Sequence, residues 1–184
     1  MRYFNSLFIS IFALFFLLVF SADSFAQLCN DRVLRTKPAS HFEMPSVDNE
    51  LAFDEVKDTV TELIWKRCSV GQSWVDASCT GTATTHTWSE ALTLGTEGWR
   101  LPNVHELSSL AEAACLGPAI DSTVFPNTQS DYYWSSSPYA KSKKSAWYVN
   151  FIWGEVNAFN SSDEYFNTQT MKHTLYVRLV RDAE

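Results

Sequence analysis

The hydroxyl, imidazole and carboxyl groups of this chain are the first candidates for catalytic chemistry, and their spacing argues against it. Three adjacent serines follow a tryptophan in Trp134-Ser135-Ser136-Ser137, but no G-x-S-x-G turn surrounds them. The pair His105-Glu106 lacks the second histidine of a zinc protease motif. No histidine stands where its spacing would mark it as a base; the four are His41, His86, His105 and His173. We therefore expect no enzyme activity, and we expect the serine hydroxyls to bond loop backbone.

Aromatic and amide residues between positions 153 and 167 are better suited to binding a ligand than to catalysis. Flat rings stack on the CH faces of sugars, while amide groups take hydrogen bonds from the hydroxyls. Phe159 and Phe166 are the aromatics that we expect to be buried. The remaining candidate contacts are Trp153, Asn157, Asn160, Tyr165 and Asn167. This segment predicts a carbohydrate site.

A cluster of three lysines, Lys141, Lys143 and Lys144, lies shortly before that segment. A surface cluster of this kind most often serves solubility. The functional alternative is capture of an anionic glycan, which would require the lysines to share one face because the chain carries net negative charge. We include the three lysines among the candidate binding residues.

Four cysteines predict two disulfides and no metal site. Three pairings are open, and we favour Cys68 with Cys79 because the 10 intervening residues contain flexible and polar types that a bridge can close into a loop. That choice leaves Cys29 with Cys115. Structural zinc needs closer pairs such as C-x-x-C, which are absent. Asp and Asn in the 155–167 segment could hold calcium, but a solvated loop is the better expectation, and we expect neither metal nor cofactor.

The first 26 residues have the features of a secretory signal. Arg2 gives a basic start, residues 7–20 are almost wholly apolar, and Ser24-Phe25-Ala26 fits cleavage after Ala26. The alternative is a membrane anchor, but a spanning helix needs about 20 apolar residues. Without Arg2 and Asp23, the mature chain keeps 13 basic and 20 acidic residues. This balance argues against nucleic acid as a partner, and the signal predicts a secreted, periplasmic or cell-surface protein.

Two helix starts precede a strand-rich second half. Residues 27–50 read as an extended arm, and a strand is expected at Leu63–Trp65. Capping boxes at Thr87/Glu90 and Asn103/Glu106 predict one helix that begins at Trp88 and ends near Gly95 and Gly98, and a second from Val104 to about Cys115. Alternating patterns predict strands at 147–151, 155–159 and 176–181, with an exposed loop over 160–173. The order indicates an α+β fold with a small antiparallel sheet.

Six blocks, in order, connect the chain to a known family. They are LIWKRC at 63–68, TW-x-EA at 87–91, GWRLPNVHEL at 98–107, YYWSSSPY at 132–139, AWYVNF at 146–151 and YVRLVR at 176–181. Together they resemble the DUF1566 family, also called the Lcl C-terminal domain. The resemblance implies a C-type-lectin-like fold over residues 51–184, and it implies that Trp99 and Arg100 are structural, with Trp99 buried and Arg100 bonding loop carbonyls.

The family resemblance also bears on function. A collagen-like bacterial adhesin that shares this domain is understood to bind sulfated glycosaminoglycans, which implies a glycan ligand here. Calcium-dependent lectins of this broad fold use E-P-N and W-N-D strings, and this chain has neither. Formylglycine-generating enzymes share the GWRLP block but use cysteines near the C-terminal end, whereas none follows Cys115. We expect an exported, non-catalytic domain that binds carbohydrate at the bacterial surface; the alternative is a protein-interaction module of an envelope assembly.

Overall fold

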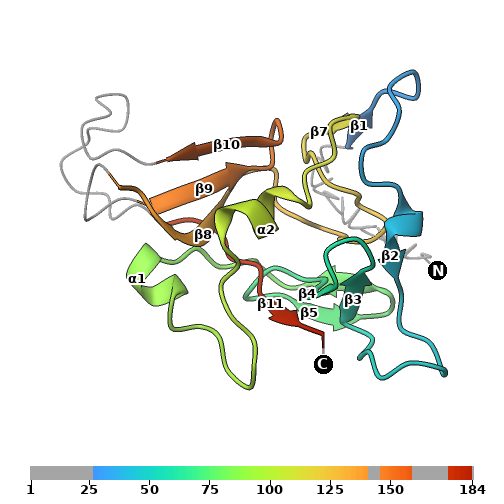
Figure 1. Cartoon of the computed structure of the whole chain (residues 1–184), viewed down its shortest axis with the longest axis horizontal. Helices are drawn as coiled ribbons and strands as arrows, with labels where there is room; N and C mark the ends of the chain where they lie inside the picture. The colour runs from blue at the N-terminus through green and yellow to red at the C-terminus, as the bar shows by residue number, and fades with distance from the viewer. Residues whose placement is uncertain (1–26, 141–145, 159–173, 184) are drawn as a thin grey trace, which may run out of the picture.

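The computed structural model describes residues 27–140, 146–158 and 174–183 (Figure 1). Two short helices and a short 3-10 helix accompany eleven strands within these residues, and every strand pair is antiparallel. The helical elements are η1 (Ala39–His41), α1 (Trp88–Ala91) and α2 (Val104–Ser108). The expectation of an α+β fold with two α-helices, small antiparallel sheets and two disulfides is confirmed.

A four-stranded sheet forms one half of the core. Its order is β11-β4-β3-β2, so the last strand lies beside β4 although they are far apart in sequence. Trp65 on β4 pairs with Val56 on one side and Val180 on the other, and all three are fully buried. The strands are β2 (Phe42–Glu43), β3 (Glu55–Asp58), β4 (Leu63–Lys66) and β11 (Val180–Asp182).

A three-stranded sheet, β10-β9-β8, forms the other half. Tyr133 and Val149 are directly paired across β8 and β9 and are fully buried with Phe151. The alternating pattern predicted the burial of Val149 and Phe151, but Asn150, expected on the other face, is buried as well. The predicted terminal strand is shorter than expected, because Leu175 and Tyr176 form only isolated bridges before β11 begins. The strands are β8 (Tyr132–Pro138), β9 (Ala146–Asn150) and β10 (Glu155–Ala158).

Both capping boxes are present, but both helices are shorter than predicted. Thr87 with Glu90, and Asn103 with Glu106, exchange the reciprocal bonds that begin α1 and α2. α1 ends at Ala91, before Gly95, whose role is close packing: a Cβ there would lie 2.1 Å from the carbonyl oxygen of Trp99. α2 ends at Ser108, and the residues after it no longer follow the helix. In this stretch the carboxylate of Glu112 accepts a hydrogen bond from the backbone N–H of Ala114.

The residues of the predicted arm pack on the body at several points. β1 (Leu28–Cys29) pairs with β7 (Cys115–Leu116), and β2 is the edge strand of the four-stranded sheet. The carboxylate of Glu112, which is fully buried, accepts hydrogen bonds from the backbone N–H groups of Thr36 and Lys37. These contacts fix residues 27–43 against the core.

Two disulfides connect the cysteines as predicted. Cys29 is bonded to Cys115, which ties β1 to β7, and Cys68 is bonded to Cys79. The second bond closes the hairpin of β5 (Ser73–Val75) and β6 (Ser78–Thr80) onto the end of β4. The short bridge therefore holds a surface hairpin in place beside the four-stranded sheet.

The roles predicted for Trp99 and Arg100 need correction. Trp99 is only partly buried, with the ammonium of Lys66 4.4 Å above its ring. Arg100 pairs with the carboxylates of Glu106 and Asp182 at 2.7 Å and 2.8 Å, and the hydrogen bonds of its guanidinium within the described residues go to these carboxylates and not to loop carbonyls. A carboxylate is the stronger partner for a guanidinium, so the nearby Glu106, held by its capping box, takes it.

The carbonyl-bonding role belongs instead to Arg178. Its guanidinium is fully buried and donates to the carbonyl oxygens of Lys66 and Arg67 and to the hydroxyl of Thr128. Burial lowers the pKa of Arg178 to about 10, so the group stays charged at neutral pH. Arg178 therefore joins the end of β4 to the loop that precedes β8.

Candidate functional site

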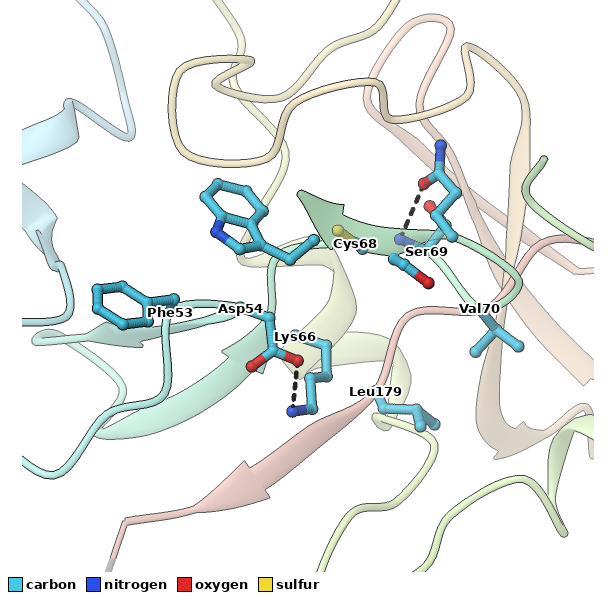
Figure 2. Close-up of a pocket in the computed structure, with 10 residues that line it drawn as sticks. Phe53, Asp54, Lys66, Cys68, Ser69, Val70 and Leu179 are labelled. Carbon is cyan, nitrogen blue, oxygen red and sulfur yellow. Dashed lines mark hydrogen bonds and ion pairs between the residues drawn. The ribbon is translucent and has the colours of Figure 1, made fainter. Parts of the chain in front are cut away.

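A pocket of about 610 Å³ opens between the start of β3, the end of β4 and the disulfide-bonded hairpin. Figure 2 shows the Asp54–Lys66 pair near its centre, with Phe53 on one side and Val70 and Leu179 on the other. We call it the Phe53–Trp74 pocket after its two aromatic residues. Its walls are Phe53, Asp54, Lys66, Cys68, Ser69, Val70, Gln72, Ser73, Trp74 and Leu179.

The two aromatic side chains give the pocket exposed apolar surface. Phe53 is 79% exposed, which is unusual for a residue of this type. Trp74, on β5, is partly buried, and the guanidinium carbon of Arg67 lies 3.9 Å from its ring centroid. Arg67 also donates to the carbonyl oxygen of Val124 at 2.9 Å, which fixes the guanidinium. The indole is therefore held against a rigid partner.

An ion pair supplies charge of both signs at the same place. The ammonium of Lys66 lies 2.8 Å from a carboxylate oxygen of Asp54 and 3.2 Å from one of Glu55. Glu55 is paired in turn with Arg181 at 3.0 Å. Because Lys66 is held by two carboxylates and by the ring of Trp99, its position is set before any ligand arrives.

The polar wall beside the hairpin is also fixed by hydrogen bonds. The amide oxygen of Gln72 accepts from the backbone N–H of Ser69 at 3.2 Å, and its amide nitrogen donates to the carbonyl oxygen of Asn127 at 3.3 Å. The Ser69 hydroxyl shares a 2.7 Å hydrogen bond with the phenol of Tyr133, whose pKa is raised by burial. Ser69 is thus engaged with the core and does not stand beside a base.

The pocket as a whole suits reversible binding of a small polar ligand. It combines two rings, two aliphatic side chains, one ion pair and an amide, which is the mixture that organic ligands need. Of the residues that the structure describes, no histidine lines it. Across residues 27–140, 146–158 and 174–183, no group of three or more His, Cys, Asp or Glu side chains is arranged to hold a metal ion.

Two serines of β8 bond backbone, as predicted, but the backbone belongs to β9 and α2 and not to a loop. The hydroxyl of Ser135 donates to the carbonyl oxygen of Trp147 at 2.7 Å, and the hydroxyl of Ser137 accepts from the backbone N–H of Val104 at 3.0 Å. The second bond satisfies one of the free donors at the start of α2. These hydroxyls position β8, β9 and α2 relative to one another.

Two of the predicted binding residues can be located. Trp153 is 60% exposed in the turn between β9 and β10, and Asn157 is exposed on β10 opposite Tyr148. Neither lines the Phe53–Trp74 pocket, and their hairpin belongs to the other main sheet. The other six lie outside the described residues: Lys141, Lys143, Lys144, Asn160, Tyr165 and Asn167.

The residues of the pocket were not predicted as a site. The one usable signal was the disulfide loop. A loop as small as the one between Cys68 and Cys79 cannot bury a tryptophan completely, and Trp74 within it is only partly buried. Lys66 belongs to the LIWKRC block, which indicates the family and a strand but no binding site. Phe53 and Leu179 carry no local signal, since only the fold brings them together.

Comparison with known proteins identifies one related family. A model of the Lcl C-terminal domain matches residues 54–181, which extend from the residue before β3 into β11 and leave β2 outside the match. No curated protein and no solved structure matches the chain. Within the described part of the chain, no helix is long and apolar enough to cross a membrane.

Proposed function

Because the chain belongs to the Lcl C-terminal domain family, we propose that it is an exported, non-catalytic domain that binds carbohydrate. Cleavage after Ala26 would release it to the periplasm, the cell surface or the medium, where two disulfides are stable. A C-type-lectin-like arrangement of the two main sheets is part of the proposal, as is a role in adhesion.

The Phe53–Trp74 pocket is the observation that carries this proposal. A sugar ring presents a CH face that packs on an aromatic side chain, and a rim of hydroxyls that need both donors and acceptors. Trp74 offers the face, and Asp54 with Lys66 offers an acceptor and a donor within 2.8 Å of each other. Two adjacent hydroxyls of one sugar can engage that pair together.

Rigidity of the pocket favours binding as well. Lys66 and Trp74 are each held by neighbouring charged side chains, so little rotamer freedom is lost when a ligand is bound. Recognition of this kind needs no calcium ion, in keeping with the absence of the E-P-N and W-N-D strings. Contact from Trp153 and Asn157 stays a prediction, as a second surface on the other sheet.

A glycan array tests the proposal. The folded, oxidised protein should be retained by a subset of immobilised oligosaccharides, both neutral and sulfated, and a heparin column should be run beside the array. Chelation of divalent cations should leave retention on the array unchanged. Lack of retention on both supports would contradict carbohydrate binding.

The second candidate function is protein interaction. Phe53 and Trp153 are large, exposed aromatic side chains of the kind that anchor protein interfaces. Envelope extract should be passed over immobilised protein, and the experiment repeated with Phe53→Ala and with Trp153→Ala. A defined partner that is kept by the wild type and lost by one variant, with an array that shows no binding, would favour this function over carbohydrate binding.

A further inference from the structure

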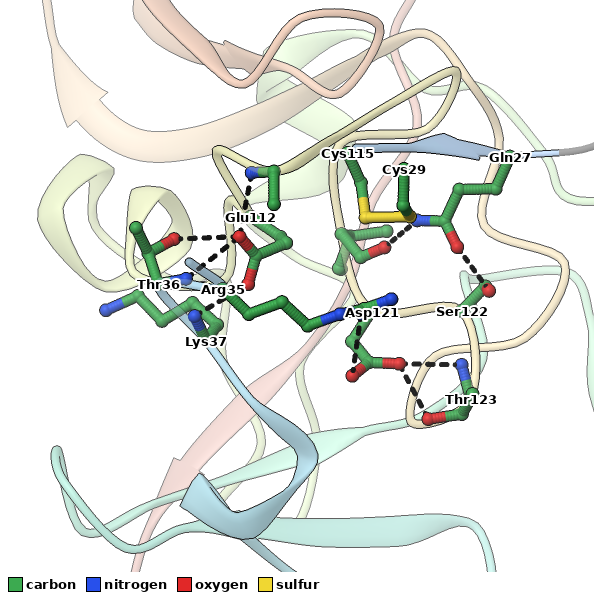
Figure 3. A network of polar contacts seen from close by, with 12 residues as sticks. Gln27, Cys29, Arg35, Thr36, Lys37, Glu112, Cys115, Asp121, Ser122 and Thr123 are labelled. Atoms are coloured by element: carbon green, nitrogen blue, oxygen red, sulfur yellow. Dashed lines mark hydrogen bonds and ion pairs between the residues drawn. A yellow bond between two sulfur atoms is a disulfide. The ribbon is translucent and has the colours of Figure 1, made fainter. Parts of the chain in front are cut away.

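The carboxamide of Gln27, the first residue that the structure describes, is held on three sides by the loop that follows β7. Its nitrogen donates to the carbonyl oxygens of Pro118, at 2.9 Å, and Ile120. Its oxygen accepts from the hydroxyl of Ser122 at 2.5 Å (Figure 3). We call this loop segment, Pro118–Ser122, the Gln27 socket.

The residues after Gln27 are fixed as firmly as its side chain. Leu28 pairs with Leu116, and Cys29 is bonded to Cys115. Figure 3 shows the disulfide beside the hydrogen bond between Gln27 and Ser122. Further along the same segment, Thr36 and Lys37 lie at the carboxylate of Glu112. The backbone of Gln27 therefore has little freedom to move its carboxamide out of the socket.

We propose that Gln27 is the N-terminal residue of the mature protein and that the socket protects it from cyclisation to pyroglutamate. This proposal rests on cleavage after Ala26 and not on the ligand of the Phe53–Trp74 pocket. In cyclisation, the α-amino nitrogen forms a bond to Cδ and the bond from Cδ to Nε2 breaks. A proton passes from the α-amino group to Nε2, which leaves as ammonia, so that no other reactant is needed.

The socket opposes this reaction in two ways. Nε2 needs a proton in order to leave, but its partners are the backbone carbonyl oxygens of Pro118 and Ile120, which can only accept one. In addition, the three hydrogen bonds hold the carboxamide in the socket, and ring closure has to turn Cδ toward the α-amino nitrogen against them. Each hydrogen bond that must break before ring closure slows cyclisation by about twofold to tenfold, so three such bonds together slow it by at least about tenfold.

One contact acts in the other direction. The hydroxyl of Ser122 donates to the carboxamide oxygen, which polarises the carbonyl group as an oxyanion donor does. That help is available only if the α-amino nitrogen can reach Cδ with the carboxamide still in place. Because the side chain must leave the socket in order to close a five-membered ring, we expect protection to prevail and Ser122 to contribute to it.

The test is a mass measurement on protein exported from a bacterial host as the full chain. Intact mass and the N-terminal peptide are followed during incubation near neutral pH, for native protein and for protein that is reduced and kept in urea. Ser122→Ala removes one of the three bonds, and Ser130→Ala is the control because the hydrogen bonds found for the Gln27 carboxamide among the described residues do not include that exposed hydroxyl. Circular dichroism establishes that both variants are folded.

We expect the mature native protein to begin at Gln27 and to keep the Gln27 carboxamide uncyclised. Cyclisation should be at least about tenfold faster in the unfolded chain. Ser122→Ala should cyclise about two- to tenfold faster than the wild type, and Ser130→Ala at the wild-type rate. Equal rates in native and unfolded protein would overturn the proposal, and so would an N-terminus elsewhere. Neither result bears on glycan binding, which the array measures separately.

Discussion

The guanidinium carbon of Arg67 lies 3.9 Å from the centroid of the Trp74 ring, so one face of the indole is covered by the protein's own cation. Arg67 is in turn held by the carbonyl oxygens of Val124 and Thr123, at 2.9 Å and 3.3 Å. A ligand must therefore approach Trp74 from the pocket side. The stack fixes the orientation of the residue on which the proposed sugar site depends.

Replacement of this arginine should weaken ligand binding without unfolding the protein. Arg67→Met keeps most of the aliphatic volume but loses the cation over the ring, an interaction of about 0.5–1 kcal/mol at partly exposed sites, and the bonds that fix the guanidinium. We expect about three- to tenfold weaker binding of an array-identified glycan, measured by calorimetry. Arg32→Met, in the exposed part of the arm, is the control. Unchanged affinity in Arg67→Met would show that the stack does not position Trp74.

Arg178 should be much less tolerant of substitution than any surface arginine. Arg178→Lys keeps the charge but cannot reach Lys66, Arg67 and Thr128 at once, because an ammonium lacks the planar fork. Buried acceptors are then left without donors, and we expect a loss of about 3–5 kcal/mol in the free energy of unfolding, measured with urea. Arg35→Lys, at a partly exposed ion pair, should cost less than about 1 kcal/mol. A similar small loss for Arg178→Lys would refute its role.

Stability should fall in acid partly through Glu112. Burial by itself would raise the pKa of Glu112. Hydrogen bonds from Ala114, Thr36 and Lys37 lower the pKa by more than burial raises it, so the net pKa lies below the ordinary value of 4.5. A carboxyl group with a lowered pKa in the folded state adds stability above its unfolded pKa, and that stability is lost as the pH falls through the folded pKa.

The corresponding variant is Glu112→Gln, which should be about 2–4 kcal/mol less stable at neutral pH because an amide accepts fewer of these bonds. Its stability should fall less than that of the wild type when the pH drops below 4.5. Urea unfolding at a series of pH values measures both effects. Asp48→Asn, at an exposed position, should follow the wild-type curve. A curve for Glu112→Gln that runs parallel to the wild type would contradict the assignment.

The short disulfide should matter for binding more than for the core. Replacing Cys68 and Cys79 together by serine opens a loop with a sequence separation of 11, for which chain entropy predicts a loss of about 3 kcal/mol. Because the loop carries Gln72 and Trp74, glycan affinity should fall by tenfold or more at temperatures where the domain stays folded. If the double variant binds with wild-type affinity, the pocket does not depend on the closed hairpin.

Local signals in the sequence predicted the elements better than their lengths. The capping boxes placed the starts of α1 and α2 correctly, since a cap depends on residues three positions apart. The predicted end of α2 was wrong, because the apolar spacing of Leu107, Leu110 and Ala114 continues past the helix. Those side chains are buried all the same, in a turn that Glu112 organises through contacts with the distant arm.

The pocket could not be predicted in the same way. Phe53, Lys66, Trp74 and Leu179 come from four separate segments, which are brought together by the pairing of β3 and β11 with β4 and by the bridge from Cys68 to Cys79. The aromatic and amide residues between 153 and 167 form a stronger pattern along the chain. Which of the two surfaces binds a ligand is a question for the binding experiments, since one stands out in sequence and the other only in space.

Titration with an array-identified oligosaccharide should separate the two tryptophan sites when wild type, Trp74→Ala and Trp153→Ala are compared in the folded state. Both variants remove a partly or largely exposed tryptophan, one in the Phe53–Trp74 pocket and one on the β9–β10 turn. We predict at least about tenfold weaker binding in Trp74→Ala, the loss of about 1.4 kcal/mol, and a smaller loss in Trp153→Ala, which lies on the second predicted surface. Wild-type affinity in Trp74→Ala together with lost binding in Trp153→Ala would contradict this prediction, and would place the site on the other sheet.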